Sequence, residues 1–463
     1  MKPRIRSLTV MGALAWLVTP AAAQVATTDY TAAIQRGRLI MSEIVQQAGV
    51  PGMSVAVGVD GEVVWTQGFG FADLEQRVPA TEATLFRVGS VSKSLTAAAV
   101  GLLIEEGLLD LDAPVQQYVP TFPEKRWPIT TRQLGGHLSG IRHYLGDEMY
   151  GATHYEHVLD GLEIFQDDTL LFEPGTRYSY SSYAWNLLSA VVESAAGIPF
   201  LQYMRQRVFD PIAMQETSAD HNDSLIPRRT RFYERTRSGI VLNAPYVDNS
   251  YKWAGGGFIA TTADLARFGM ALTDGEFLAP ETLEILWTSQ HLDDGSPTGY
   301  GIGWSVGTDH DGRRVVSHSG GSIGGTAFLL LFPDHGLVVA TLANSSAPMR
   351  LSTAWAIAEP FLPPVPVDLS YQDHRGTYAC TYQGRDNAEQ AATLYVVGPP
   401  DDYAVRFTTG NITADGLQAW SAGRTFRAVV IENGFSIGNI WLTVTGETAT
   451  GHWNNVALTC DVQ

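Results

Sequence analysis

The sequence predicts an α+β fold, in which an antiparallel sheet is flanked by helices beside an all-helical region, with a small all-β domain at the C-terminal end. Two strand-like runs near the start are joined by Asp60-Gly61, and Asp-Gly between alternating apolar runs is a strong hairpin signal. A helical region occupies the middle, and four strand-like runs follow between residues 304 and 344. Strands separated from helices in this way are typical of an antiparallel sheet covered by helices.

The main domain is expected over residues 29–361. It opens with a helix over 34–48, followed by strands over 53–59 and 62–68. The next helix begins just after Ser90 and continues through a leucine-rich stretch to residue 111. The later elements are expected as helices at 183–196 and 200–208, and as strands at 304–306, 315–318, 327–332 and 337–344.

A second unit follows the main domain. Four prolines between residues 360 and 366 indicate a stiff linker, which we assign to residues 362–370. Residues 371–463 then alternate short apolar runs with turn residues, at 392–397, 403–408, 428–431, 441–445 and 453–459. This pattern predicts a β-sandwich or a small barrel.

The composition narrows the classes of partner. The chain has 463 residues, of which 45% are hydrophobic and 17% charged, as in a soluble protein with a sizeable core. Its formal net charge of -18 argues against nucleic acid and anionic membrane surfaces as partners. A small-molecule substrate is the expected partner.

The N-terminus has the pattern of a secretory signal peptide over residues 1–23. A basic start precedes an apolar run over 8–18, and three alanines precede Gln24 as a cleavage site. An uncleaved anchor is the alternative, but the apolar run is short for a membrane span. We therefore expect a periplasmic or secreted protein with no membrane span after cleavage.

The chain contains two cysteines, Cys380 and Cys460. In an exported protein an even number of cysteines suggests a disulfide. This bond would tie the two ends of the C-terminal unit together. Two separate buried thiols are the alternative.

The strongest chemical motif is Ser90-Val91-Ser92-Lys93, where a strand-like run gives way to an Ala- and Leu-rich helix. Side chains one helical turn apart share a face, so Ser90 and Lys93 are neighbours. A serine hydroxyl is a poor nucleophile until a neighbouring base takes its proton. A lysine becomes such a base when burial and nearby cations lower its pKa.

Two further segments accompany this motif. The first, residues 173–182, carries Tyr180 and Ser182 after a Pro-Gly-Thr loop, where a tyrosine can offer its hydroxyl to a serine. A buried tyrosine with an ordinary hydrogen bond is the alternative. The second is His318-Ser319-Gly320-Gly321 at the end of a strand. Small residues there let a substrate backbone approach the strand edge.

Together these motifs, with Gly136 to Ile141, resemble the serine β-lactamase-like superfamily. It includes class C β-lactamases, D-Ala-D-Ala carboxypeptidases, family VIII esterases and D-aminopeptidases. The segments 109–112, 137–144 and 245–258 are most similar to the mitochondrial branch found in animals, which is thought to act as a peptidase and to assemble into filaments. The resemblance implies a β-lactamase/transpeptidase-like fold and raises the expectation of a homo-oligomer.

The resemblance also implies a role for each site residue. Ser90 would be the acylated nucleophile, and Lys93 its proton acceptor or the tuner of that acceptor. Tyr180 would be the general base, or the acid for the leaving group. The backbone N–H groups of Ser90 and Gly321 would form the oxyanion hole. His318, Ser319 and Gly320 would contact the substrate, as the Lys-Thr-Gly motif does in the family.

Two positions depart from the family pattern. Ser182 stands where the family usually has an asparagine that contacts the acylamide carbonyl of β-lactams. His318 stands where a lysine is usual, and a histidine is mostly neutral near pH 7. Both departures argue against strong β-lactamase activity. Arg142 and Lys252 are alternative cations for a substrate carboxylate.

Two other motifs are coincidental matches. The segment 320–324 fits the Gly-x-Ser-x-Gly nucleophile elbow, but Ser322 lacks the strand–elbow–helix context of that motif. His154 and His157 have a metal-like spacing with no further ligand cluster, so a solvated helix face is expected and no metal or cofactor is predicted.

The sequence therefore predicts an exported serine hydrolase that acts through an acyl-enzyme at Ser90 on carboxylic esters or small peptide or amide bonds. A β-lactamase or D-Ala-D-Ala carboxypeptidase is one alternative. A weakly catalytic scaffold or filament-forming protein is the other.

Overall fold

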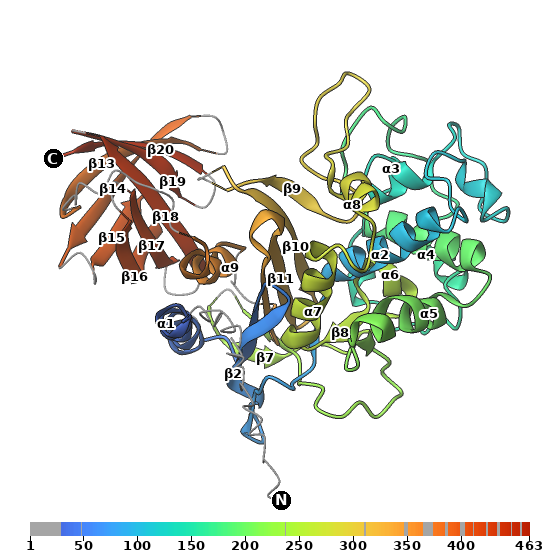
Figure 1. The fold of residues 1–463 in the computed structure, drawn as a ribbon, viewed down its shortest axis with the longest axis horizontal. Coiled ribbons are helices and arrows are strands. Elements are labelled where there is room, and N and C mark those ends of the chain that lie inside the picture. The colour runs from blue at the N-terminus through green and yellow to red at the C-terminus, as the bar shows by residue number, and fades with distance from the viewer. Residues whose placement is uncertain are drawn as a thin grey trace, which may run out of the picture.

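The fold was analysed in a computed structural model. It describes residues 29–463 apart from 48, 237, 310–311, 347–350, 364–373, 385–387, 399–402, 411, 423–424, 433–435, 446 and 454–455. The expected signal peptide, 1–23, lies outside the described residues, as does most of the expected linker, 362–370. A helical region, a central sheet and a C-terminal barrel follow one another across the molecule (Figure 1).

The central sheet is antiparallel and has seven strands in the order β3-β2-β1-β12-β11-β10-β9. The strand that comes first in the chain, β1, pairs along its length with the strand that comes last, β12, at the centre of the sheet. The strands are β1 (Gly52–Val59), β2 (Glu62–Asp73), β3 (Val78–Pro79), β9 (Ser305–Thr308), β10 (Arg314–Ser322), β11 (Gly325–Phe332) and β12 (Leu337–Ala343).

Helices cover both faces of this sheet (Figure 1). Helix α7 (Thr262–Thr273) packs on one face, and α1 (Thr31–Gln47) and α9 (Leu351–Ala358) pack on the other. Because side chains alternate along a strand, Leu329 and Leu331 of β11 join the core under α7, whereas Phe328 and Leu330 join the core under α1 and α9. Every residue of β11 is buried, which explains its continuous apolar sequence.

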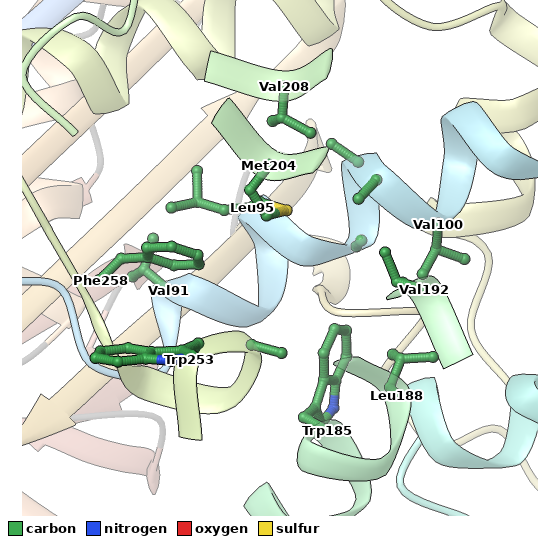
Figure 2. Packing of buried hydrophobic residues seen from close by; sticks show 14 of the residues in the cluster. Val91, Leu95, Val100, Trp185, Leu188, Val192, Met204, Val208, Trp253 and Phe258 are labelled. Carbon is green, nitrogen blue, oxygen red and sulfur yellow. The ribbon is translucent and has the colours of Figure 1, made fainter. Parts of the chain in front are cut away.

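The helical region is built around α2 (Val91–Glu105). Figure 2 shows Val91, Leu95 and Val100 of α2 packed among aromatic and aliphatic side chains of its neighbours. Those neighbours are α4 (Ser182–Ala196), the helical turns α5 (Phe200–Tyr203) and η4 (Met204–Phe209), α6 (Trp253–Gly256) and β8 (Phe258–Ala260). Nearly all of α2 is buried, including the polar residues of its first two turns, so its N-terminus lies inside the helical region.

The remaining elements are short. The helices are η1 (Val115–Gln117), α3 (Thr131–Gly135), η2 (Glu148–Tyr150), η3 (Asp160–Ile164), η5 (Asp210–Ile212), η6 (Ser250–Lys252), α8 (Pro280–Trp287), η7 (Pro333–His335) and η8 (Glu359–Phe361). The strands are β4 (Phe86–Arg87), β5 (Ser218–Ala219), β6 (Tyr233–Arg235) and β7 (Val241–Asn243). Strand β4 pairs with β8, which places the start of α2 beside the end of α6.

The C-terminal strands close into a barrel in sequence order, rather than forming a sandwich. They are β13 (Gly376–Gln383), β14 (Glu389–Val397), β15 (Ala404–Thr409), β16 (Ile412–Ala422), β17 (Thr425–Glu432), β18 (Ser436–Thr445), β19 (Thr448–Trp453) and β20 (Val456–Val462). The barrel lies against α9 (Figure 1). Cys380 and Cys460 face each other on β13 and β20 and form the expected disulfide, which joins the first and last strands.

Several expected boundaries were wrong. The helix after Ser90 ends at Glu105 rather than near residue 111, because Gly107 adopts a left-handed conformation with φ +67°. The run 453–459 contains the end of β19 and the start of β20 instead of one strand, and β13 and β16 were not predicted. Within the described residues no single helix is long and apolar enough to cross a membrane, although Ser182–Ala196 and Phe200–Ile212, bent by 72°, reach that length and composition together.

Candidate active site

Ser90 lies at the N-terminus of α2, directly after a tight turn. Gly89 has φ +49°, and a Cβ at this position would lie 2.6 Å from the carbonyl oxygen of Gly321. Only glycine therefore lets the start of α2 approach β10 so closely. Ser90 is the N-cap residue of α2, but its side chain makes no capping hydrogen bond. Its hydroxyl is left for the side chains around it.

Lys93 is fully buried one turn later and has three polar neighbours. Its Nζ lies 2.6 Å from the carbonyl oxygen of Gly255, 3.1 Å from Ser182 Oγ and 3.2 Å from Ser90 Oγ. Burial, and to a smaller extent the charge of Lys252, lower the pKa of Lys93 well below its usual value. A neutral amine has two N–H bonds and one lone pair, so it can donate to two of these oxygens and accept the proton of Ser90.

Tyr180 completes the group around the nucleophile. Its side chain is hydrogen-bonded to Ser90, and the Nζ of Lys93 lies 4.9 Å from the centre of its ring. Burial raises the pKa of Tyr180 far above its usual value, so the phenol is protonated at neutral pH. The ring is held by His137, whose centroid is 4.1 Å away. This geometry favours a proton donor over a phenolate base.

Ser182 contacts Lys93, and the sequence did not predict this contact. It is the first residue of α4, and Ser181 caps that helix by accepting a hydrogen bond from Ala184. The backbone N–H of Ser182 donates to Nδ1 of His143 over 3.1 Å, and burial lowers the pKa of His143 to about 4. Ser182 therefore helps to hold the ammonium of Lys93, which contacts both serines.

His318 is neutral and has both ring nitrogens occupied. Nδ1 lies 2.6 Å from the carbonyl oxygen of Ser319, and Nε2 lies 2.8 Å from the hydroxyl of Tyr300. Because a carbonyl only accepts, Nδ1 carries the hydrogen and Nε2 accepts from Tyr300. Burial, then the charge of Lys93, lower the pKa of His318 to about 3. His318 therefore supplies no positive charge near neutral pH.

The edge of β10 is open next to Ser90. Strand β9 pairs with β10 only as far as Ser317, so Ser319 to Gly321 have no strand partner on that side. Ser319 and Gly321 are exposed, whereas Gly320 is buried. A Cβ added to Gly321 would meet no atom within 4 Å. Within the part of the chain that the structure describes, this edge of β10 is therefore open at Ser319 and Gly321.

The two alternative cations differ in their surroundings. Arg142 is held by carboxylates, at 2.7 Å from Glu148 and 2.5 Å from Asp168, so its charge is already neutralised. Lys252 is buried, and its Nζ lies 5.6 Å from the ring centre of Tyr144 and 5.1 Å from that of Tyr251. Among the described residues no carboxylate forms an ion pair with it.

The coincidental motifs lie outside this group. Ser322 ends β10, and the residues after it form the β10–β11 hairpin, so no helix follows as the elbow motif requires. His154 and His157 lie in an irregular segment, not on the expected helix face, and His154 contacts Asp248 over 3.1 Å.

Sequence reasoning also missed several groups that contact the site residues. The carbonyl of Gly255 accepts from Lys93, and the hydroxyl of Tyr300 contacts His318. The rings of His137 and His143 lie against Tyr180, and that of Tyr144 lies against His143. The two histidines and Tyr144 fall in the segment 137–144, whose resemblance to relatives was the available signal. Tyr300 carries no such signal, because it stands alone between two glycines.

Known proteins of several kinds are similar to this chain. The chain matches the Beta-lactamase family model over residues 38–360. It is 33% identical over 439 residues to the serine beta-lactamase-like protein LACTB, mitochondrial, of Homo sapiens, covering 72% of this chain and 80% of that protein. It is 28% identical over 352 residues to a D-aminopeptidase of Gluconobacter oxydans (strain 621H), covering 74% of this chain and 64% of that protein.

A solved structure covers the barrel as well. The octameric penicillin-binding protein homologue from Pyrococcus abyssi aligns with a TM-score of 0.61 at 23% identity, covering 92% of this chain and 99% of that one. At this identity the likeness concerns the fold. The family match across residues 38–360 and the 33% identity to the human relative confirm the predicted resemblance: the chain belongs to the beta-lactamase family of serine hydrolases.

Proposed function

We propose that this protein hydrolyses carboxylic esters or small peptide or amide bonds through an acyl-enzyme at Ser90. The observation that carries the proposal is the contact between Ser90 and a fully buried lysine, with Nζ of Lys93 3.2 Å from Ser90 Oγ. A buried, neutral lysine is the kind of base that activates a serine.

The reaction follows from the positions of three groups. Ser90 Oγ attacks the substrate carbonyl carbon as its proton passes to Lys93. The bond to the leaving atom then breaks, that atom takes the proton of the Tyr180 hydroxyl, and Lys93 gives the proton it holds to the Tyr180 oxygen. Water attacks the acyl carbon as Lys93 takes one of its protons, and the acid leaves as that proton passes from Lys93 to Ser90 Oγ.

The negative oxygen formed in each attack needs hydrogen-bond donors. The backbone N–H groups of Ser90 and Gly321 are proposed for this role, because Gly321 N would lie only 2.9 Å from a Cβ on Gly89. Losing one such donor typically slows an enzyme on the order of 10²–10³-fold. The exposed edge of β10, Ser319 to Gly321, would take the substrate backbone beside them.

The preference for esters and small amides over β-lactams rests on the two departures from the family pattern. Ser182 Oγ is occupied by Lys93, and neutral His318 offers no charge to a β-lactam carboxylate. Export is proposed from the N-terminal pattern of residues 1–23, with the main domain at 29–361, the linker at 362–370 and the barrel domain at 371–463.

Hydrolysis of p-nitrophenyl butyrate and nitrocefin by the protein beginning at Gln24 tests the proposal. Ser90→Ala should abolish ester turnover, whereas Ser322→Ala should leave it unchanged, because Ser322 Oγ is buried and has no hydrogen-bond partner. Nitrocefin should be turned over poorly by all three proteins. Ester turnover that survives in Ser90→Ala would refute the acyl-enzyme, and fast nitrocefin turnover would refute the substrate preference.

Assembly into a homo-oligomer is proposed as a separate property. It is supported by the octameric state named for the archaeal homologue, whose structure covers 92% of this chain. Light scattering after size exclusion should give a mass several times that of one chain. A monomer at micromolar concentration would contradict it.

A further inference from the structure

Two of the four lysines in the sequence are buried beside the same short helix, α6. The lysines are Lys2, Lys93, Lys125 and Lys252. Lys93 donates to the carbonyl oxygen of Gly255 in α6, and the side chain of Lys252 passes that helix at Gly256, with its Cδ 3.9 Å from where a Cβ would stand. Both residues are at most 4% exposed.

The ammonium of Lys252 is held without being neutralised. It lies over the rings of Tyr144 and Tyr251, and an aromatic face attracts a cation while leaving its full charge in place. The nearest acidic group that acts on it, Asp220, is already bound by Arg87 at 2.7 Å, Arg229 at 3.2 Å and Asn249 at 3.0 Å. This buried group therefore carries more positive than negative charge.

The ionisable groups around the two lysines are cationic, neutral or already paired. Beside Lys93 they are Tyr180, a protonated phenol, and His137 and His318, whose pKa values burial lowers. Arg87 disfavours the charge on Lys252 and Asp220 favours it. Tyr144 and Tyr251 are protonated phenols, because burial raises the pKa of both. His143 is neutral, with its pKa lowered by burial, Lys93 and Lys252, and Glu148 is paired with Arg142. No negative charge in this set is free to hold a proton on Lys93.

We propose that Lys252 is a positioning residue, whose ammonium, buried beside α6 with no carboxylate paired to it among the described residues, keeps Lys93 in the neutral form that can accept the proton of Ser90. The inference deepens the proposed function and rests on it. Two like charges in a buried site are not both retained, so the pair loses its first proton at a lower pH than either lysine would alone.

Both lysines hold a proton less firmly than an exposed lysine does. Burial and Arg87 lower the pKa of Lys252 to about 7, and burial and Lys252 lower the pKa of Lys93 well below its usual value. On the proposal, Lys93 is the lysine that loses its proton first as pH rises, because it must accept the proton of Ser90. The single charge of the pair is then on Lys252.

The test follows the titration of Lys93 directly. Lysine isotope-labelled at Cε gives one NMR signal from each of Lys93, Lys125 and Lys252 in the mature chain, assigned with Lys125→Arg and with the variants at 252. Lys252→Met keeps the length and removes the charge, and Lys252→Arg keeps the charge. In Lys252→Met the midpoint of Lys93 should rise on the order of one pH unit, and in Lys252→Arg it should stay within a few tenths.

The pH dependence of ester hydrolysis tests the same inference independently of the NMR titration. The acid limb of the kcat/KM profile for p-nitrophenyl butyrate should move to higher pH in Lys252→Met by the same amount, with an unchanged plateau, and Lys252→Arg should restore it. An unmoved Lys93 signal would overturn the inference. So would a loss of rate that is equal at every pH, or a rise in KM confined to substrates with a carboxylate. Because the NMR titration needs no turnover, failure of the proposed hydrolysis is seen separately in Ser90→Ala.

Discussion

The hydroxyl of Tyr300 donates to Nε2 of His318 over 2.8 Å, at the position where relatives carry the lysine of the Lys-Thr-Gly motif. The Nδ1–H group of the imidazole donates a hydrogen bond to the carbonyl oxygen of Ser319 in the same strand, so the ring is neutral. The strand edge that faces the nucleophile is therefore polar but uncharged. On the proposed function, this pair leaves a substrate carboxylate without a cation at residue 318.

Replacing His318 by lysine should change substrate preference more than overall rate. A cation at this strand edge would attract a carboxylate by a charge-assisted hydrogen bond. We expect the ratio of nitrocefin to p-nitrophenyl butyrate turnover to rise roughly tenfold in His318→Lys, which corresponds to about 1.4 kcal/mol. His318→Gln, which stays neutral, is the control. An equal ratio in the two variants would show that charge at this position does not set the preference.

Removing the proposed base should nearly abolish ester hydrolysis. In Lys93→Met, kcat/KM should fall on the order of 10²–10⁴-fold, the usual contribution of a positioned general base. Lys93→Arg should be equally impaired, because a guanidinium remains protonated. Lys125→Met, a substitution away from the site, should retain full activity. An active Lys93→Arg enzyme would show that a neutral amine is not required.

Stability should fall in mild acid because buried imidazoles are held neutral. The pKa of His143 is lowered to about 4 and that of His318 to about 3, whereas in the unfolded chain both are near 6.5. Between these pKa values the unfolded chain binds more protons than the folded protein does. The free energy of unfolding therefore decreases as pH falls from about 6.5 towards about 4. The Tm measured by calorimetry should drop by several degrees over that range.

A double variant provides the control for this pH effect. In His143→Gln combined with His318→Gln, the acid decrease in Tm should be smaller, because two of the titrating groups are gone. An identical decrease in the double variant would assign the effect to other groups, of which buried His137, whose pKa is also lowered, is the first to test.

Breaking the disulfide should destabilise the barrel without impairing the site. The bond closes a loop with a sequence separation of 80 and joins β13 to β20. A loop of that length stabilises the fold by roughly 4–5 kcal/mol in the chain-entropy model. Cys380→Ser with Cys460→Ser should lower the denaturant midpoint of barrel unfolding, while kcat on the ester stays within about twofold of the wild-type value. A proportionate loss of kcat would show that the barrel supports the active site directly.

The sequence alone determined the fold class and the pairing of Ser90 with Lys93 in the candidate active site. Alternation of apolar residues with turn signals located the β1–β2 hairpin and the late strands, because the side-chain period of a strand is visible in a single chain. The spacing of Ser90 and Lys93 placed them on one helical face, because one turn of helix is a local property. The cysteine pair was also predicted from number and setting, and the structure joins them.

The tertiary structure decided what these local patterns could not. It closed the C-terminal strands into a barrel, since closure depends on pairing between β13 and β20 at the two ends of the unit. It also pairs Arg142 with Glu148 and Asp168, and among the described residues no carboxylate forms an ion pair with Lys252. The charge states of Lys93 and His318 depend on burial and on groups more than 100 residues away in the sequence, because Lys252 acts on Lys93 and Lys93 acts on His318, so they arise only when the chain has folded.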